Sequence, residues 1–249
     1  MPLAIDLYCG LGGWTEGLLA EGWDVIGFDI ERHVYDDHRY PAQLVVQDVL
    51  TLHGSQFRSA DLIVASPPCQ EYSWMDMPWS RAEAHATMIR ADATGAEMDR
   101  LNRLFNACFR IQREACDAAG RHIPLIIENV RGAQPWVGRA RWAYGSFYLW
   151  GDVPAIMPQI IRARKFNPDR ANHHTKNTGG SWFAIGSPGQ KVVKNNPDGR
   201  KGVGTGAEWF DQNHCVHSSK SPARKMASAM IAKIPITLSR HIARTFYPR

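Results

Sequence analysis

The stretch SPPCQEYSW, residues 66–74, places a cysteine directly after two prolines. Proline fixes φ at about −65° and keeps the residue before it extended, so the approach to Cys69 is conformationally restricted. A nucleophilic thiol needs partial exposure, a fixed approach and either a lowered pKa or a nearby base. Cysteine is also often a small buried apolar residue. These residues by themselves therefore leave both a catalytic and a structural interpretation of Cys69 open.

A carboxyl group is available for the same chemistry at the end of another apolar run. Glu128 and Asn129 close the stretch IPLIIENV, residues 123–130. A thiol and a carboxyl over one pocket suit attack on an electron-poor heteroaromatic ring, because the acid can protonate or hydrogen-bond a ring nitrogen as the thiol adds. The alternative is a carboxylate with a purely structural role.

Glycines and acids at three further positions indicate a cofactor. Gly10, Gly12 and Gly13 follow an apolar run and precede a helical pattern, so backbone amides there can approach a ligand. The spacing departs from GxGxxG and no GK[ST] follows, which argues against a nucleoside triphosphate. Asp29 is placed to bind a ribose diol and Asp48 an adenine amino group. Together they predict an adenosine-containing cofactor, against the alternative of a tight turn and two solvated strand ends.

The elements that must position these residues alternate between strand and helix patterns. Near-continuous apolar runs separated by helical spacing predict an α/β, Rossmann-like fold with a mostly parallel sheet covered on both faces. Ligands bind such sheets at the carboxyl ends of the strands, where the residues above fall. The predicted strands are 3–9, 23–31, 42–49, 60–66 and 123–130, with a strand and turn in 144–158, and the predicted helices are 14–22, 98–120 and 236–247.

Two segments lack clear periodicity. Residues 75–100 are charged and Met-rich, which predicts a mobile loop, and residues 160–222 are rich in Gly, Asn, Lys and Pro. In the second segment, His173 and His174 and the run His214–His217 lack the second close pair that a zinc site needs, so no metal is predicted. The final helix is expected to return to the sheet.

Charge is distributed unevenly along the chain. Residues 1–138 hold 11 Arg, no Lys and 19 acids, a balance of −8, whereas residues 139–249 hold 18 Lys and Arg and 5 acids, a balance of +13. A basic half beside an acidic half indicates that one part binds a polyanion. A basic surface that serves only solubility is the alternative.

Cysteine usage and hydropathy point to a cytoplasmic protein. Five cysteines form an odd set with no CxxC pair, which favours reduced thiols over a disulfide framework. No stretch approaches the ~20 apolar residues of a membrane span. The start, MPLAIDLYCG, lacks the basic segment of a secretory signal.

Taken together, the motifs resemble those of the DNA (cytosine-5) methyltransferases. DLYCGLGG (6–13), PPCQ (67–70) and ENV (128–130) resemble the family's cofactor loop, nucleophile motif and glutamate motif in order and spacing, and AKIPITLSRHIA (232–243) is similar to its closing helix. The resemblance covers residues 3–132 and this last stretch, and its specificity comes from the combination of motifs.

The resemblance implies methyl transfer from S-adenosyl-L-methionine, with S-adenosyl-L-homocysteine as product, to C5 of a flipped-out cytosine. Cys69 would add to C6, Glu128 would contact N3 and the exocyclic amine, and Asn129 would orient the Cys69 loop. Residues 71–100 would close over the site. The implied cofactor contacts are Asp6, Tyr8, Gly10, Gly12, Gly13, Asp29, Ile30, Asp48, Val49 and Pro68.

The chain also departs from the family pattern. The expected Q-x-R-x-R strand has no counterpart in YGSFYLWG, residues 144–151. Arg139 and Arg141, which immediately precede that strand, are predicted to replace its arginines in preference to Arg162 and Arg164. Ala232-Lys233 stands where the final motif usually begins with Gly-Asn.

These observations predict a monomeric, bacterial or phage-encoded DNA (cytosine-5) methyltransferase acting on double-stranded DNA. Residues 1–154 would form the catalytic and cofactor-binding domain, 155–225 a small, irregular recognition lobe, and 226–249 the returning helix. An RNA cytosine-5 methyltransferase and a catalytically silent DNA-binding relative remain alternatives. A restriction system, a phage and a mobile element are equally compatible settings.

Overall fold

The computed structural model describes residues 1–72, 79–158, 225–226, 229–230 and 232–248. The chain divides into two compact units, one of residues 1–74, 79–160 and 233–249 and the other of residues 75–78 and 161–232. Most of the second unit lies outside the described residues, and so do the predicted recognition lobe (from residue 159 to 224), Arg162 and Arg164, and the histidines considered for zinc. The expected domain boundaries therefore stay predictions. Over the described ranges, none of the helices has the length and apolarity needed to cross a bilayer.

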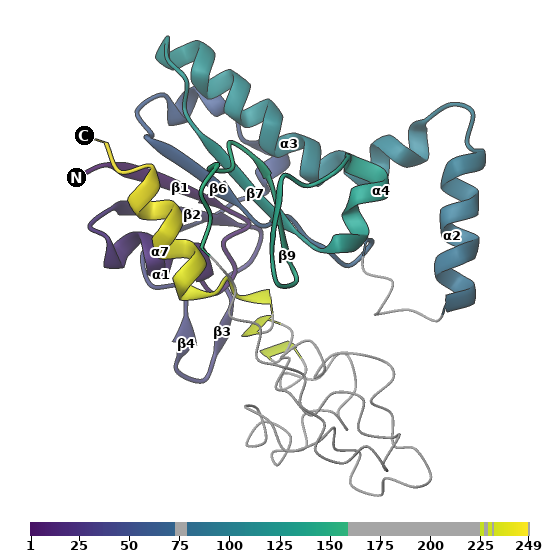
Figure 1. Ribbon diagram of the computed structural model, residues 1–249, viewed down its shortest axis with the longest axis horizontal. Helices are drawn as coiled ribbons and strands as arrows, with labels where there is room; N and C mark the ends of the chain where they lie inside the picture. Colours follow the sequence, from purple (N-terminus) through teal and green to yellow (C-terminus); the bar gives the residue numbers. More distant parts are fainter. Residues whose placement is uncertain (73–78, 159–224, 227–228, 231, 249) are drawn as a thin grey trace, which may run out of the picture. The chain divides into compact units, whose positions relative to one another are not determined.

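Within the described residues, seven strands form one sheet in the order β5-β2-β1-β6-β7-β9-β8 (Figure 1). The first five strands pair in parallel, whereas β9 pairs antiparallel with both β7 and β8. This arrangement confirms the predicted Rossmann-like, mostly parallel sheet. The strands are β1 (Leu3–Leu7), β2 (Asp24–Asp29), β5 (Gln43–Val46), β6 (Leu62–Ala65), β7 (Leu125–Asn129), β8 (Trp142–Tyr144) and β9 (Phe147–Gly151).

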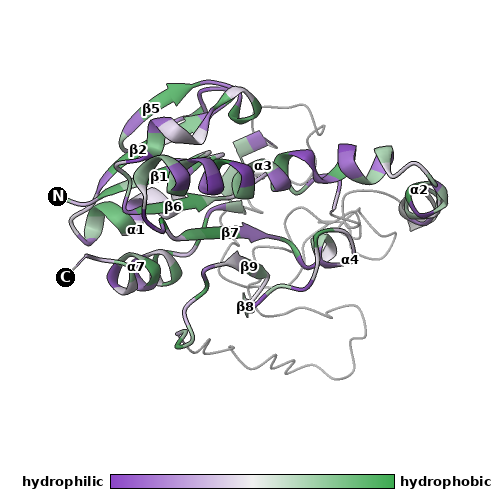
Figure 2. Ribbon diagram, turned by 90° about the horizontal axis from the view of Figure 1, so that it is seen from above, coloured by the Kyte–Doolittle hydropathy of each residue, from purple (hydrophilic) through white to green (hydrophobic). Residues whose placement is uncertain are grey.

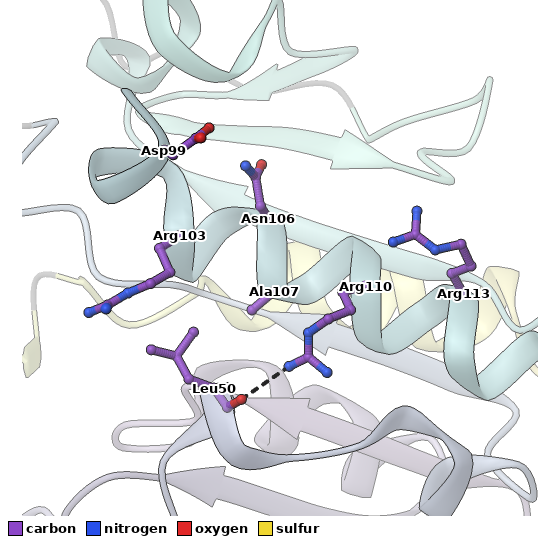
Figure 3. Close-up of a pocket in the computed structure, with 7 residues that line it drawn as sticks. All are labelled: Leu50, Asp99, Arg103, Asn106, Ala107, Arg110 and Arg113. Atoms are coloured by element: carbon purple, nitrogen blue, oxygen red, sulfur yellow. Dashed lines mark hydrogen bonds between the residues drawn. The ribbon is translucent and has the colours of Figure 1, made fainter. Parts of the chain in front are cut away.

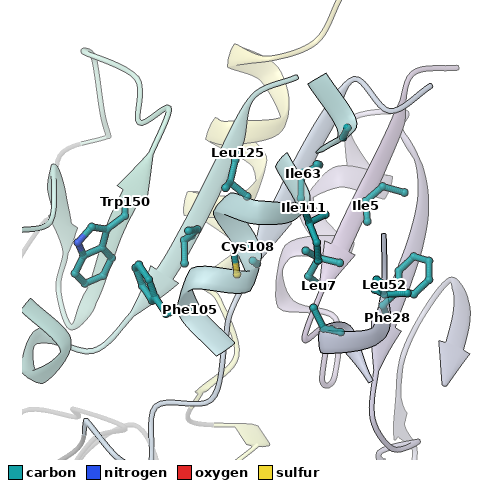
Figure 4. Close-up of a cluster of buried hydrophobic side chains, with 14 of the residues drawn as sticks. Ile5, Leu7, Phe28, Leu52, Ile63, Phe105, Cys108, Ile111, Leu125 and Trp150 are labelled. Atoms are coloured by element: carbon teal, nitrogen blue, oxygen red, sulfur yellow. The ribbon is translucent and has the colours of Figure 1, made fainter. Parts of the chain in front are cut away.

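Helices cover both faces of the sheet, as expected for strands that are apolar throughout. Side chains alternate along β1: Ile5 and Leu7 belong to a core cluster that contains Cys108 of α3 (Ala96–Ala119), whereas Asp6 bonds Thr15 of α1 (Gly13–Ala20). Helices α1 and α3 therefore lie on opposite faces. Figure 4 shows the α3 side, where the side chains of the helix meet those of the strands.

Helix α3 is the predicted helix 98–120, and it starts two residues earlier. Its buried residues recur at helical spacing and its Gly120 has a φ of 64°, a left-handed conformation that glycine adopts without steric cost. The 3-10 helices η1 (Val49–Thr51) and η2 (Gly54–Phe57) pack against α3. Arg110 of α3 donates to the carbonyls of Leu50 and Leu52 at 3.3 and 2.9 Å, and thereby ties the segment after β5 to the helix.

The C-terminal helix α7 (Ile236–Thr245) confirms the helix expected there and packs on α1 (Figure 1). The approach is close: a Cβ on Gly13 would lie 2.3 Å from Ile234 N, and one on Gly17 would lie 2.2 Å from Ser239 Oγ. Ser239 Oγ donates to the Trp14 carbonyl at 2.5 Å. Glycine is needed at both positions because α7 and the two residues Lys233 and Ile234 before it occupy the space of a side chain.

Ion pairs also hold α7 and the segment before it to α1. Lys233 Nζ lies 2.5 Å from Glu16 Oε1, and Arg240 and Arg244 both bind the Glu21 carboxylate, at 2.5 and 2.8 Å. The guanidinium groups lower the pKa of Glu21 to about 2 through hydrogen bonds. Exposed pairs of this kind contribute modestly to stability, so the glycine-mediated packing carries more of the contact.

The predicted loop 75–100 is wrong over much of its length. Residues 73–78 lie outside the described residues, but Trp79–Ala91 form helix α2 and α3 begins at Ala96. The α2 sequence contains four alanines and two arginines, residues that favour helix by intrinsic propensity. Of its side chains that the structure describes, Ala86 and Ile89 are buried among the core residues. A buried stripe this short does not produce a hydrophobic periodicity that would indicate a helix.

Candidate active site

The residues singled out for chemistry gather at one edge of the sheet. Strands β1, β2, β6 and β7 run parallel, so Tyr8, Asp29, the segment 66–69 and Glu128 all follow or end strands at the same edge. Figure 2 shows β7 changing from hydrophobic to hydrophilic toward its end, where Glu128 and Asn129 lie. This is the crevice position at which open α/β sheets bind ligands.

The nucleophile candidate lies on a segment bonded to its neighbouring strand. Ser66 N donates to the Leu7 carbonyl at 3.1 Å, and Asn129 Nδ2 donates to the Pro67 carbonyl at 2.9 Å. Pro67 is buried and Pro68 is exposed, while Cys69 is half-buried. Asn129 therefore contacts the backbone two residues before the sulfur, which is the geometry that its predicted orienting role requires.

Glu128 lies next to this segment. The register Ala65↔Ile127 of β6 and β7 places Ser66 beside Glu128. Burial raises the pKa of Glu128 to about 8, although a hydrogen bond from Ser66 opposes the shift. Trp14 Nε1 in turn donates to Ser66 Oγ at 3.0 Å, which leaves the Ser66 proton for the carboxyl. At neutral pH, Glu128 is thus a buried acid that holds a proton.

The glycine turn begins directly after β1. Gly12 N donates to the Cys9 carbonyl at 2.7 Å, and Gly12 has a φ of 79° as it starts α1. A Cβ at Gly12 would lie 2.5 Å from Pro41 Cδ, so close packing as well as backbone conformation requires glycine. Tyr8 also has a positive φ, 56°, and its hydroxyl donates to the Leu104 carbonyl of α3 at 2.9 Å.

Asp29 closes the turn from the neighbouring strand. Its Oδ2 accepts a hydrogen bond from Gly10 N at 2.9 Å, and His33 Nε2 lies 3.5 Å from its Oδ1. Burial raises the pKa of Asp29, but the hydrogen bonds from His33 and Gly10 outweigh burial and leave the pKa below its ordinary value. Asp29 is therefore an ionised acceptor at neutral pH. The sequence reasoning missed His33, whose spacing from Asp29 was the available signal.

The remaining cofactor candidates provide an apolar and a polar contact beside Asp29. Ile30 is 69% exposed at the end of β2, an unusual exposure for a large aliphatic side chain, and Val49 is buried in η1. Asp48 Oδ1 accepts from Leu50 N at 2.9 Å. Open space faces Gly10, because a Cβ there would meet no atom within 4 Å. Carboxylates for hydroxyl and amino donors, an exposed aliphatic side chain and free space together fit an adenosine group.

Asp6 lies in a different environment from the other cofactor candidates. It is fully buried in β1, where its Oδ2 accepts from Thr15 Oγ1 at 2.6 Å. The Thr15 hydroxyl also bonds Tyr40 Oη at 2.7 Å. Asp6 Oδ1 has no hydrogen-bond partner among the described residues, and burial raises the pKa of Asp6 to about 7. A direct contact of Asp6 with a cofactor stays a prediction.

The two preferred arginines lie on the far side of β9. Both Arg139 and Arg141 are exposed, and Arg141 N donates to the Leu149 carbonyl at 2.8 Å. Leu149 pairs with Glu128 across β7 and β9. The backbone of Arg141 is therefore two strand spacings from Glu128, about 10 Å, which a long arginine side chain can span in part.

A pocket of about 370 Å³ lies between η1 and α3 (Figure 3). Arg103, Arg110 and Arg113 give it a positive character that Asp99 offsets only in part. Arg110 crosses to the Leu50 carbonyl, the interaction dashed in Figure 3. None of the predicted site residues lines this pocket, although Leu50 directly follows Val49. The lining residues are Leu50, Asp99, Arg103, Asn106, Ala107, Arg110 and Arg113.

Three solved structures are similar to the chain at low identity. A protein encoded within an E. coli prophage, described as a DNA modification methyltransferase, has 23% identity and a TM-score of 0.35 over 53% of this chain and 33% of that one. Entamoeba histolytica methyltransferase EhMeth has 15% identity and a TM-score of 0.33 over 55% and 41% of the two chains. S. pombe Dnmt2 methyltransferase has 13% identity and a TM-score of 0.45 over 98% and 97%. The matched part thus spans only about a third of the first of these proteins.

The sequence comparison is more specific. No curated protein sequence matches the chain. The sequence model of the C-5 cytosine-specific DNA methylases matches residues 3–85, a span that contains the glycine turn, Asp29, Asp48 and the PPCQ segment. The match includes two of the motifs that carry the resemblance, DLYCGLGG and PPCQ, whereas ENV and AKIPITLSRHIA lie outside it. Over residues 3–85, about a third of its length, the chain is similar to the C-5 cytosine-specific DNA methylase family.

Proposed function

We propose that the chain is an S-adenosyl-L-methionine-dependent methyltransferase that modifies C5 of cytosine in double-stranded DNA through a covalent bond from Cys69. One observation carries the proposal: a buried carboxyl at the end of β7, whose pKa burial raises to about 8, lies beside the segment that presents a half-buried cysteine after β6. A protonated acid beside a thiol is the pair that activates a pyrimidine ring toward addition at C6.

The cofactor proposal depends on the groups around the glycine turn. Asp29 would accept hydrogen bonds from the ribose hydroxyls, Asp48 would accept from the adenine amino group, and Ile30 and Val49 would contact the adenine ring. The ionised state of Asp29 supports this assignment, because hydroxyl donors need an acceptor. When bound, S-adenosyl-L-methionine supplies the methyl group and leaves as S-adenosyl-L-homocysteine.

Cys69 and Glu128 act on the cytosine ring. The Cys69 thiolate forms a bond to C6 and the electron pair moves toward N3, where the proton of Glu128 neutralises the developing charge. This increases the electron density at C5, the position that receives the methyl group. Loss of the C5 proton to a base and breakage of the sulfur–C6 bond then restore the ring double bond, and the N3 proton returns to Glu128. Asn129, through Pro67, keeps the sulfur in register with Glu128.

A base inside a duplex cannot reach the crevice, so the proposal includes flipping of the target cytosine, at a cost of a few kcal/mol. Arg139 and Arg141 would bind the cytosine carbonyl from the side of β9. The basic half of the chain would hold the phosphates and so offset the cost of flipping. The free energy that offsets flipping would therefore come mainly from phosphate contacts outside the crevice.

The test is transfer of a labelled methyl group from S-adenosyl-L-methionine to duplex DNA, compared with tRNA. We expect transfer to DNA by the wild type, and at least a 10³-fold loss in Cys69→Ser, because a serine hydroxyl is a far weaker nucleophile at neutral pH. Cofactor affinity, measured by calorimetry, should stay within about twofold in the variant. A combined loss of cofactor affinity and activity would show that Cys69 is structural.

Two further outcomes separate the alternatives. Transfer confined to tRNA would replace the DNA substrate with RNA. DNA that contains 5-fluorocytosine traps the covalent adduct, because fluorine at C5 cannot leave as the proton does. No adduct from the wild type, under conditions in which the DNA is bound, would identify a catalytically silent DNA-binding protein. Bisulfite sequencing of plasmid DNA from expressing cells would then give the target sequence of an active enzyme.

A further inference from the structure

We propose that Tyr72 and Asn102 form a buried junction that positions Cys69 for attack, which makes both of them positioning residues for the reaction. The inference rests on the proposed function. It concerns side chains that carry no charge and that lie outside the motif residues assigned above. Their hydrogen bonds connect three parts of the chain: the segment that follows Cys69, helix α3 and the helix α4 (Gln134–Val137).

Tyr72 anchors the end of the nucleophile segment. Its side chain is 2% exposed, and its hydroxyl lies 3.0 Å from Asn102 Oδ1 and 3.2 Å from the Leu101 carbonyl of α3. Tyr72 N also donates to the Cys69 carbonyl at 3.0 Å. The turn that carries the sulfur is therefore closed by its own backbone and fixed to α3 by the Tyr72 side chain.

Asn102 extends this contact toward the acid. It is 6% exposed, and its Nδ2 donates to the Trp136 carbonyl in α4 at 2.9 Å. Helix α4 lies between Glu128 and Arg139 in the chain, and Arg90 of α2 stacks over the Trp136 ring at 5.2 Å. The Asn102 amide thus accepts a hydrogen bond from Tyr72 through its oxygen, and it donates one through its nitrogen to α4, which follows the strand that carries Glu128.

The junction complements the anchor at the other end of the segment. Asn129 holds the Pro67 carbonyl and Tyr72 is held by Asn102, so Cys69 lies between two buried side-chain contacts. An attacking atom must be held to within about 1 Å, because a displacement of that size can cost about 10²-fold in rate. With one anchor removed, the segment keeps its fold but loses this precision.

The experiment measures adduct formation with 5-fluorocytosine DNA in a single turnover, for Tyr72→Phe, Asn102→Ala and the double variant. The amplitude reports the fraction of correctly folded enzyme, whereas the rate constant reports positioning. For each single variant we expect a rate constant lower by about 10- to 100-fold, with an unchanged amplitude and an unchanged affinity for S-adenosyl-L-methionine. The rate constant of the double variant should be within about threefold of that of the slower single variant, because both substitutions break the same hydrogen bond between Tyr72 and Asn102.

The chain offers a matched control for each residue type. Asn106→Ala changes an exposed asparagine one turn farther along α3, and Tyr247→Phe removes the hydroxyl of a partly exposed tyrosine near the C-terminus. Both should react at the wild-type rate. Variant rates equal to wild type, or amplitudes that fall while the rate constant is unchanged, would overturn the positioning role and leave the proposed function intact. No adduct with wild type would instead overturn the function and the inference together.

Discussion

At the scale of single residues, the site depends on carboxyl groups whose environments differ. Glu128 and Asp6 are buried and have raised pKa values of about 8 and about 7, whereas hydrogen bonds keep Asp29 ionised. The first two lie in or beside the apolar sheet, and the third lies at the polar turn. A neutral acid and an ionised acceptor at one sheet edge suit proton donation and ribose binding, respectively.

The protonation of Glu128 predicts a pH dependence of the reaction. We expect kcat/KM for methyl transfer to fall as pH rises above about 8, because Glu128 then loses the proton that N3 requires. Rates measured from about pH 6 to about pH 10 would show this decrease as the alkaline limb of the pH–rate profile. Glu128→Gln should be slower at every pH and should lack the limb, since an amide does not titrate. An unchanged limb in Glu128→Gln would assign it to another group.

The same group contributes to stability with a definite sign. The folded-state pKa of Glu128 is raised above the value of about 4.5 expected for the unfolded chain. Its contribution to the free energy of unfolding is therefore fully present below about pH 4.5 and is lost as pH rises through about 8. Urea unfolding at several pH values should accordingly show a flatter profile for Glu128→Gln than for the wild type.

At the scale of elements, close packing between α1 and α7 holds the C-terminal helix near the glycine turn. Gly13 and Gly17 are one helical turn apart and both face the C-terminal segment. Glycine inside a helix costs about 0.5–1 kcal/mol relative to alanine, so these positions sacrifice intrinsic helix stability for contact. The start of α1, which follows the turn, is thereby supported from the end of the chain.

We predict that Gly17→Ala destabilises the protein by about 1–3 kcal/mol, the usual cost of overpacking. The added Cβ would lie 2.2 Å from Ser239 Oγ and 2.7 Å from Arg240 N, and this clash outweighs the better helix propensity of alanine. The free energy of unfolding in urea is the measurement. Adding Ser239→Gly should recover only part of the lost stability. It removes the clash with the Ser239 side chain but leaves the clash with Arg240 N. A Gly17→Ala protein as stable as the wild type would refute the packing argument.

Elements with strong local signals were predictable from the sequence, and those that depend on tertiary contacts were not. The parallel strands read as apolar runs and α3 as a long amphipathic pattern, so both were predicted correctly. Helix α2 was missed because its buried stripe is short. The pair of Tyr72 and Asn102 was missed because a single sequence does not show which side chains meet across 30 residues of chain. His33 was missed although it lies only four residues from Asp29. Asp6 was assigned from its motif, although alternation along β1 places its side chain on the face that α1 covers.

At the scale of the whole molecule, the two halves of the chain have opposite charge. The α/β core draws mainly on the acidic half, with a balance of −8, while residues 139–249 have a balance of +13. The cations of α7 and of the segment before it are partly neutralised by Glu16 and Glu21. The lysines and arginines elsewhere in the basic half are therefore the main candidates for phosphate contact.

We predict that DNA affinity falls by about 10²-fold between about 50 and about 200 mM salt, as expected for about four phosphate contacts. Fluorescence anisotropy at several salt concentrations would give the slope. Neutralising Lys191 and Lys194 with glutamine should reduce the slope by about two, whereas Arg240→Gln should leave it unchanged because Arg240 binds Glu21. An almost flat salt dependence would remove the polyanion-binding argument.

Helix α3 carries the attachments of two loops with different tasks. Asn102 and Leu101 hold the segment that bears the sulfur, and two turns farther on Arg110 grips the carbonyls of Leu50 and Leu52 beside the adenine-side residues. Because α3 bonds to both segments, a shift of the helix would change both sets of hydrogen bonds. Under the proposed function, cofactor binding beside η1 would therefore alter the position of Cys69, and the affinities for cofactor and nucleic acid would be coupled.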